Sequence, residues 1–214
     1  MKLTKKIILA FGVLATGAGY AQTATSTATP TTTGSGLLGH RYTELSLGAE
    51  NIDHLSNHGY SVSASANNPL IPGVLDAGAT YSYSWIRGPF KGHANTIGAY
   101  ATAYTPLAGV RPFATAALGY QWTSARFGAG DDEAVWGAAI GVEIPAGVVT
   151  VTPRISYADD FEGSSRSSQA WTTSVEVNYW YSRTSAVYTS LGRTDIRRSP
   201  FDSWNWEIGL RARF

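Results

Sequence analysis

The feature that most constrains this chain is an alternation of apolar and polar side chains with a period of two. Successive side chains of a β-strand point to opposite faces, so the alternation predicts strands with one apolar and one polar face. In one segment Tyr81, Tyr83 and Trp85 share one parity, while Ser82 and Ser84 share the other. We expect ten strands and no helix, near residues 39–49, 59–68, 75–86, 94–105, 111–124, 133–144, 148–158, 170–181, 185–193 and 203–214.

The distribution of rings separates a membrane barrel from a soluble sandwich, which would bury its apolar face. Aliphatic side chains occupy the middle of the apolar stripes, and rings gather toward their ends. Two ring belts around an aliphatic band are what a bilayer requires of a barrel exterior. The predicted membrane-interface rings are Tyr81, Tyr83, Trp85, Trp122, Trp136, Trp171, Tyr179, Tyr181, Trp204 and Trp206.

The connections between the segments alternate in length. Those after the second, fourth, sixth and eighth segments are short, and the first three of these contain Gly and Pro. The other connections are mostly longer and more polar. Short periplasmic turns and long outer loops are typical of transmembrane barrels. We therefore predict an all-β fold, a closed antiparallel up-and-down transmembrane barrel of about ten strands, with eight as the alternative.

Most strand charges share the parity of the polar face, so we expect these charges inside the barrel. Acids and arginines nearly balance there, which predicts a lumen filled by ion pairs and not an open channel, because small barrels are filled by their own side chains. A narrow conduit for ions or small solutes is the alternative. The predicted lumen network is Glu44, Asp76, Arg111, Glu143, Arg154, Glu176, Glu207, Arg211 and Arg213.

The first residues predict export from the cytoplasm. Three lysines precede an apolar run over 7–18 and small residues around Ala21, which indicates a signal peptide over 1–21 with cleavage near Ala21. Residues 22–36 are a Thr/Ser-rich stretch without large apolar side chains, so we expect a flexible leader, followed by the barrel over 37–214. Removing the lysines leaves 13 basic and 15 acidic residues, without a basic patch for nucleic acid.

The last segment ends on an aromatic residue, and every second residue before it is apolar. This pattern resembles the C-terminal targeting strand of bacterial outer-membrane barrels, and residues 37–214 resemble the small, opacity-protein-like porin superfamily. The resemblance implies location in the outer membrane and recognition by the barrel assembly machinery. It also implies contact with the lipid bilayer and lipopolysaccharide, and we expect a monomer. The predicted assembly signal is Trp206, Ile208, Leu210, Ala212 and Phe214.

Catalysis is not expected. The His54-Leu55-Ser56 run resembles the motif of outer-membrane lipid A deacylases, but no acid follows at the spacing that would orient the histidine. The Asp131-Asp132 pair has only a superficial similarity to rim proteases. We predict no cofactor and no metal site, because the chain has no cysteine and its loop histidines lack ligand spacing.

Two details of the strand pattern leave alternatives. In segment 94–105 the rings Tyr100 and Tyr104 have the opposite parity to Ile97 and the alanines, so either face could point inward. In segment 185–193 Val187 and Leu191 compete in the same way with Ala186 and Tyr188. Pro153 lacks the N–H that a strand paired on both sides needs, and we expect a β-bulge there.

Overall fold

A computed structural model describes residues 36–53, 58–88, 91–125, 132–161, 169–197 and 202–214 of the chain. Among these residues no helix is long and apolar enough to cross a membrane. Ten strands are present, one for each predicted segment. Their bounds are β1 (Tyr42–Ile52), β2 (His58–Ile71), β3 (Leu75–Arg87), β4 (Gly92–Tyr104), β5 (Arg111–Ala125), β6 (Asp132–Ala146), β7 (Val149–Asp160), β8 (Ala170–Trp180), β9 (Ser185–Ile196) and β10 (Ser203–Arg213).

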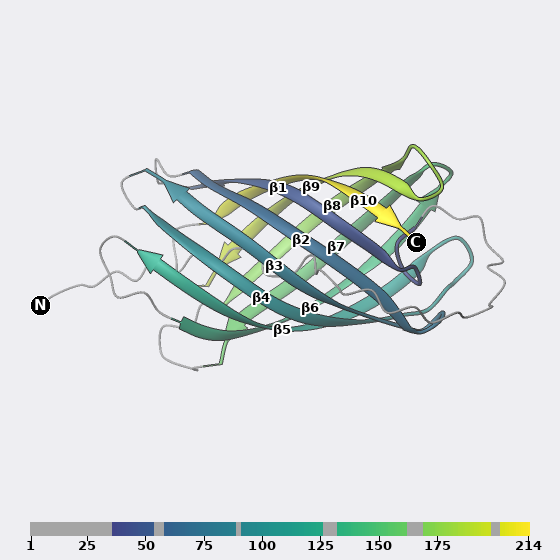
Figure 1. Cartoon of the computed structure of the whole chain (residues 1–214), viewed down its shortest axis with the longest axis horizontal. Helices are drawn as coiled ribbons and strands as arrows, with labels where there is room; N and C mark the ends of the chain where they lie inside the picture. Colours follow the sequence, from purple (N-terminus) through teal and green to yellow (C-terminus); the bar gives the residue numbers. More distant parts are fainter. Residues whose placement is uncertain (1–35, 54–57, 89–90, 126–131, 162–168, 198–201) are drawn as a thin grey trace, which may run out of the picture.

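The strands form a closed antiparallel barrel in which each strand pairs with its two sequence neighbours and β1 closes the ring against β10 (Figure 1). The closing ladder runs from Tyr42 opposite Arg213 to Ile52 opposite Ser203. The predicted fold class and the strand number of ten are therefore confirmed. The strands are tilted relative to the long axis, and the C-terminus lies at the end drawn on the right.

That right-hand end, called the turn end below, carries the short connections. Gly73, Gly109 and Gly147 each have a φ between +66° and +82° there, a backbone conformation in which glycine costs least. The opposite end, called the loop end, joins β1 to β2 and the other odd-to-even pairs, and parts of these connections fall outside the described residues.

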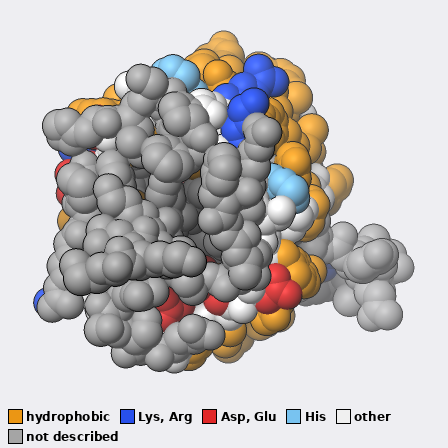
Figure 2. Space-filling model, turned by 90° about the vertical axis from the view of Figure 1, so that its left-hand side faces the viewer, with side chains coloured by type: hydrophobic (Ala, Val, Ile, Leu, Met, Phe, Trp, Pro, Cys, Tyr) orange, Lys and Arg blue, Asp and Glu red, His pale blue; other side chains and the backbone are white. Residues whose placement is uncertain are grey.

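The polarity of this barrel is the reverse of a soluble protein's. Leu45, Leu118 and Ile140 lie near mid-strand on the exterior, and more than half of each is exposed. Serines and threonines are buried in the lumen instead, as in the Ser46–Ser63 hydroxyl pair. A view onto the loop end shows hydrophobic side chains along the outer wall and charged ones near the rim (Figure 2).

The exterior rings lie mainly toward the loop end. They contact one another across strands, as in the Tyr60–Trp85 stack on β2 and β3, with ring centroids 5.7 Å apart. At the turn end the exposed rings are Tyr179, Tyr181 and Phe214, and the rest of that rim carries aliphatic side chains. The second predicted belt, at the turn end, is therefore largely aliphatic. All ten predicted interface rings lie on the exterior. They are Tyr81, Tyr83, Trp85, Trp122, Trp136, Trp171, Tyr179, Tyr181, Trp204 and Trp206.

Glycines on neighbouring strands determine which face points inward in β4 and β9, the two strands for which the sequence leaves this open. In β4 Tyr100 lies in the lumen opposite Gly78 of β3, and in β9 Tyr188 lies in the lumen opposite Gly209 of β10. A Cβ on Gly209 would meet Tyr188 Cε1 at 2.4 Å and the Leu45 carbonyl oxygen at 2.7 Å. Each ring therefore points inward because the neighbouring strand provides a glycine beneath it.

The prediction of a β-bulge at Pro153 is wrong. The pairing of β7 with β8 is continuous through Pro153, opposite Val175, and the register with β6 is the same before and after it. The ladder with β6 instead lacks the pairs at Pro153 and Thr152, so the missing N–H is accommodated by a local gap without a register shift. The register shift lies in β2 instead, between Pro69 and Ile71.

Candidate functional site

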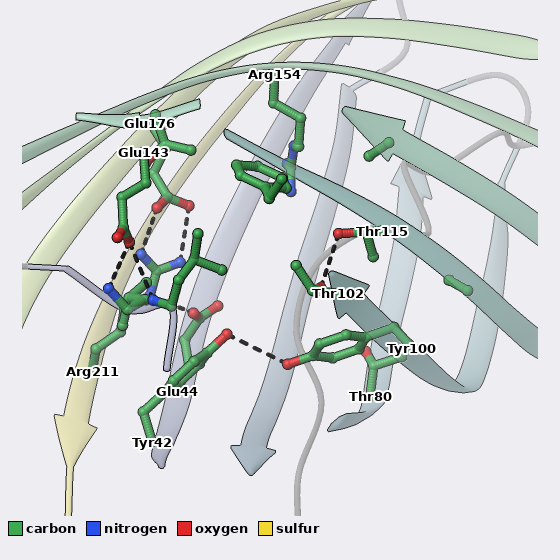
Figure 3. A pocket seen from close by; sticks show the side chains of 16 residues that line it. Tyr42, Glu44, Thr80, Tyr100, Thr102, Thr115, Glu143, Arg154, Glu176 and Arg211 are labelled. Carbon is green, nitrogen blue, oxygen red and sulfur yellow. Dashed lines mark hydrogen bonds and ion pairs between the residues drawn. The ribbon is translucent and has the colours of Figure 1, made fainter. Parts of the chain in front are cut away.

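The most connected charge in the lumen is Arg211 of β10 (Figure 3). Its Nε donates to Glu44 Oε2 of β1 at 2.5 Å. Its two Nη atoms donate to both carboxylate oxygens of Glu176 on β8, at 2.6 and 2.9 Å, and Nη1 also donates to Asn178. Forked pairing of this kind uses all three nitrogens of the guanidinium. The cluster thus ties β10 to β1 and β8 across the lumen.

Tyr188 of β9 completes this cluster. Its ring lies under the guanidinium, with Arg211 Cζ 3.8 Å from the ring centroid. Its hydroxyl oxygen lies 2.7 Å from Glu44 Oε1 and 2.9 Å from Glu207 Oε1. The Arg211 cluster, named below for Arg211, Glu44, Glu176, Tyr188 and Glu207, therefore joins four strands.

A second ion pair lies at the turn end and binds main chain. Arg111 Nη1 of β5 contacts Glu143 Oε1 of β6 at 3.0 Å. The other Glu143 oxygen accepts the Leu37 N–H at 2.6 Å, and Arg111 also donates to the Leu38 carbonyl at 3.1 Å. Residues just before β1 are thus held inside the barrel, against β5 and β6.

The same residues are also held by side chains of β2, β3 and β10. The Gly39 N–H donates to Asp76 Oδ2 of β3 at 2.9 Å, and Asn67 of β2 donates to the His40 carbonyl at 3.0 Å. Arg213 of β10 donates to the Gly36 carbonyl at 2.8 Å. Residues 36–40, called the plug segment below, therefore cross the turn end of the lumen and are fastened to β2, β3, β5, β6 and β10.

The plug segment corrects one sequence-based boundary, the start of the first strand. Residues 39–41, predicted as the start of the first strand, precede β1, which begins at Tyr42. Of the predicted leader over 22–36 only Gly36 is described, and it is buried in the plug segment. The predicted signal peptide over 1–21 lies outside the described residues. The backbone N–H and C=O groups of the plug segment, which would pair with a neighbour in a strand, form hydrogen bonds with lumen side chains instead.

His40 is the titratable side chain of the plug segment. Burial, followed by the positive charges of Arg213 and Arg111, lowers the pKa of His40 from 6.5 to about 4. The imidazole is therefore neutral at physiological pH. A proton on it would add a third positive charge beside two arginines.

Two cavities of about 130 Å³ each occupy the lumen. One adjoins the plug segment and the Arg211 cluster, where Tyr42 and Tyr100 hydroxyls lie 3.4 Å apart (Figure 3). The other lies toward the loop end and is walled mostly by serines and threonines. Thr80 and Arg154 line both cavities, and Arg154 points into the space between the walls.

The nine predicted lumen residues all belong to the inner face, but they do not form one ion-pair network. Among the described residues the lumen ion pairs are those of Arg211 with two acids and of Arg111 with Glu143. Asp76 binds main chain, and Arg213 lies 3.7 Å above the Trp180 ring. The nine are Glu44, Asp76, Arg111, Glu143, Arg154, Glu176, Glu207, Arg211 and Arg213.

Several members of the site are absent from the sequence-based set. Asn67 and Asn178 are almost fully buried in the lumen and share the parity of the charged residues, which is the signal that could have identified them. Tyr188 could not be assigned from its own strand, because its inward orientation depends on Gly209 of the neighbouring strand.

At the loop end Arg193 lies outside the barrel among three acids. Its guanidinium contacts Asp53 at 2.8 Å, Asp202 at 3.3 Å and Asp195 at 3.7 Å. This group links the end of β1 to β9 and to the residue before β10. Of the residues weighed for catalysis, His54, Ser56 and Asp131 lie outside the described residues, and Asp132 is the first residue of β6.

No family model matches the chain, and no curated protein matches it. Among solved structures, the translocator domain of the autotransporter NalP from Neisseria meningitidis has a TM-score of 0.45 at 8% identity, covering 81% of this chain and 87% of that one.

Neisserial surface protein A has a TM-score of 0.40 at 13% identity, covering 81% of this chain and 97% of that one. The NanC porin has a TM-score of 0.43 at 7% identity, covering 79% of this chain and all of that one. The neighbours are outer-membrane barrel proteins. The chain itself has the fold of a closed antiparallel β-barrel of ten strands. Its own closed ring and apolar exterior match what a bilayer requires, since every strand satisfies its backbone groups without water.

Proposed function

We propose that the protein is an integral outer-membrane barrel with a closed lumen and a structural or surface-interaction role that it performs through its loop end. The observation that supports closure is the plug segment, whose backbone is bound by side chains of β2, β3, β5, β6 and β10 at the turn end. The two lumen cavities hold about 130 Å³ each, whereas wide aqueous channels are typical of barrels of about sixteen to eighteen strands.

The exterior supports the proposed partners. The side chain of Phe214 and the exposed apolar side chains before it on β10 form one continuous stripe. We propose that the barrel assembly machinery recognises this stripe. The apolar exterior suits the lipid bilayer, and the loop-end rim suits lipopolysaccharide, in which divalent cations neutralise charge. A closed ring has no free strand edge for pairing with a second copy, which supports a monomer. The stripe consists of Trp206, Ile208, Leu210, Ala212 and Phe214.

A narrow porin for ions or small solutes is the second candidate, and the two hydrophilic cavities along the lumen favour it. Conduction in that case would require displacement of the plug segment. A lipid-modifying enzyme or a rim protease ranks below both, because the motifs weighed for catalysis lack their partner residues in the sequence.

Single-channel recording in planar bilayers separates the two candidates. We expect the folded protein to insert without conductance steps. The double variant Asp76→Asn, Glu143→Gln weakens two anchors of the plug segment, and we expect it to conduct intermittently. Ser174→Ala, a lumen substitution away from that segment, is the matched control and should stay silent. Reproducible steps from the unaltered protein would refute closure and favour the porin.

A further inference from the structure

Acidic residues are distributed unevenly around the loop end. Over residues 58–125, which contain β2 to β5, the sequence has a single acid, Asp76, and its contact with the plug segment places it at the turn end. On β6, β7 and β9, by contrast, Asp132, Asp159 and Asp195 lie at or next to the strand boundary at the loop end. A view onto this end shows Lys, Arg and His side chains mainly on one part of the rim and Asp and Glu side chains mainly on another (Figure 2).

Two cations lie on the β2–β5 side of the rim without an acidic partner. Arg87 ends β3 and Lys91 precedes β4, and both side chains are exposed. Neither forms an ion pair with another described residue. Arg87 Cζ lies 5.6 Å from the centroid of the Tyr60 ring, so a ring contact positions this guanidinium while its donors stay accessible. The exposed His58 of β2 lies opposite Arg87 in the ladder.

The exterior beside these cations is hollowed. An open groove of about 510 Å³ is lined by Tyr83, Trp85, Lys91, His93 and Ser124 among others. Its rings contact one another, with centroids 5.7 Å apart for Tyr83 and Trp85 and 6.0 Å apart for Tyr83 and His93. This surface, called the basic groove below and defined by those five residues, combines aromatic rings with an exposed ammonium group and hydrogen-bond donors.

The basic groove lies at the level of lipid headgroups. Tyr83 and Trp85 belong to the ring-rich rim at the loop end, and the aromatic belts of membrane barrels lie at the interface between hydrocarbon and headgroups. Toward the turn end the same wall continues with exposed aliphatic side chains, Ile97 on β4 and Leu118 on β5. A ligand bound here meets cations at one end and an apolar wall at the other, which suits an amphipathic lipid better than a free anion.

We propose that the basic groove binds a phosphate group of lipopolysaccharide, the phosphorylated glycolipid of the outer leaflet, whose acyl chains lie along Ile97 and Leu118. Lys91 and Arg87 supply the positive charge, because ammonium and guanidinium groups form strong hydrogen bonds with phosphate oxygens. The acids at the loop end of β6, β7 and β9 repel phosphate, so we expect one site per barrel. The inference rests on the proposed function, because it requires the loop end to face the outer leaflet.

Binding of purified lipid A, the phosphorylated anchor of lipopolysaccharide, to the folded protein in detergent tests the site. Native mass spectrometry counts the bound lipid and gives its dissociation constant. We expect one bound lipid A, weakened about fivefold by Arg87→Gln or Lys91→Gln and about 25-fold by the two together, the usual effect of basic residues near an anionic lipid surface. The double variant Arg41→Gln, Arg183→Gln is the matched control, because it removes two exposed arginines at the turn end and should leave the affinity unchanged.

Three results would overturn the site. They are an unchanged affinity in the double variant Arg87→Gln, Lys91→Gln, an equal affinity for lipid A that lacks its phosphates, and an equal affinity for phosphatidylglycerol. The first two would show that these cations do not bind phosphate, and the third would show that the groove does not recognise the glycolipid. Gel mobility of unboiled samples establishes that each variant is folded.

Tryptophan fluorescence locates the bound lipid independently. The change in emission that accompanies lipid A binding should be smaller in Trp85→Phe than in the unaltered protein. It should be unaffected in Trp204→Phe, which removes an exposed ring of β10 on the side of the rim that carries the acids. A smaller change in Trp204→Phe instead would place the lipid on that side and contradict the proposal.

Failure of this inference and failure of the proposed function are seen in different measurements. Conductance steps in planar bilayers would refute closure of the lumen and leave lipid A binding unaffected. A folded barrel that inserts without conductance and does not bind lipid A would refute the basic groove alone.

Discussion

Replacing Leu210 by arginine tests directly whether the apolar exterior faces lipid. Leu210 lies on the outside of β10, halfway along the exterior stripe between Trp206 and Phe214, and is 56% exposed. Leu107 is the matched control, since it is equally exposed at 57% but lies in the turn between β4 and β5. In a soluble protein both substitutions would be harmless, because each would only exchange an exposed apolar side chain for a charged one.

In a bilayer the two variants should differ strongly. Arginine on the lipid face costs about 2–4 kcal/mol at the midplane and about 0–1 kcal/mol near the interfaces. Leu210 lies between the two ends of the stripe, so the midplane cost applies to it. Leu107 lies in a turn, so the interface cost applies to it. We therefore expect Leu210→Arg to lose about 2–3 kcal/mol more unfolding free energy than Leu107→Arg.

Equilibrium unfolding in denaturant, with the protein folded into lipid vesicles, measures this difference. Heat-modifiable gel mobility and tryptophan fluorescence report the folded fraction. Losses that agree within about 0.5 kcal/mol for the two variants, the usual size of a neutral surface change, would refute the lipid-facing assignment of this stripe.

Three further predictions concern the lumen. Arg211→Gln leaves two buried carboxylates without their cation and should cost about 3–5 kcal/mol in the same unfolding assay, so a loss below about 1 kcal/mol would contradict the role of the cluster. Gly209→Ala forces a Cβ against Tyr188 and a backbone carbonyl and should cost about 1–3 kcal/mol, which is checked by its denaturant midpoint. The pKa of His40 is about 4 when the plug segment is docked and 6.5 ordinarily, so the docked state is fully stable above pH 6.5 and loses stability as the pH falls through 4. The melting temperature followed by gel mobility should therefore fall less with acidification in His40→Gln, and equal pH profiles would contradict this coupling.

Much of the barrel could be predicted from local pattern alone. Strand parity is local, because each side chain points opposite to its neighbours, so the alternation around Tyr81 and Ser82 already separates the outer from the inner face. The ten strands follow the ten alternating segments, and the turn glycines such as Gly73 occur at the expected short connections. The strand ends were less accurate, since β1 begins three residues later than the pattern suggested.

The lumen could be predicted only as a set of inward residues. Glu44 and Arg211 lie 167 residues apart in the chain, and no local pattern indicates that they meet. The plug segment was missed because its backbone bonds are to side chains such as Asp76 and Glu143, which lie far from it in the sequence.

The amino-acid sequence by itself determined the strand number, the two faces of the sheet and the ring-rich rim, because these depend on side-chain alternation and on the solvent that each face requires. Only the tertiary structure decided which charges pair, which rings turn inward and how the turn end is closed. Those outcomes depend on register between strands and on the closure of the ring, which bring β1 beside β10 and a glycine beneath each inward tyrosine.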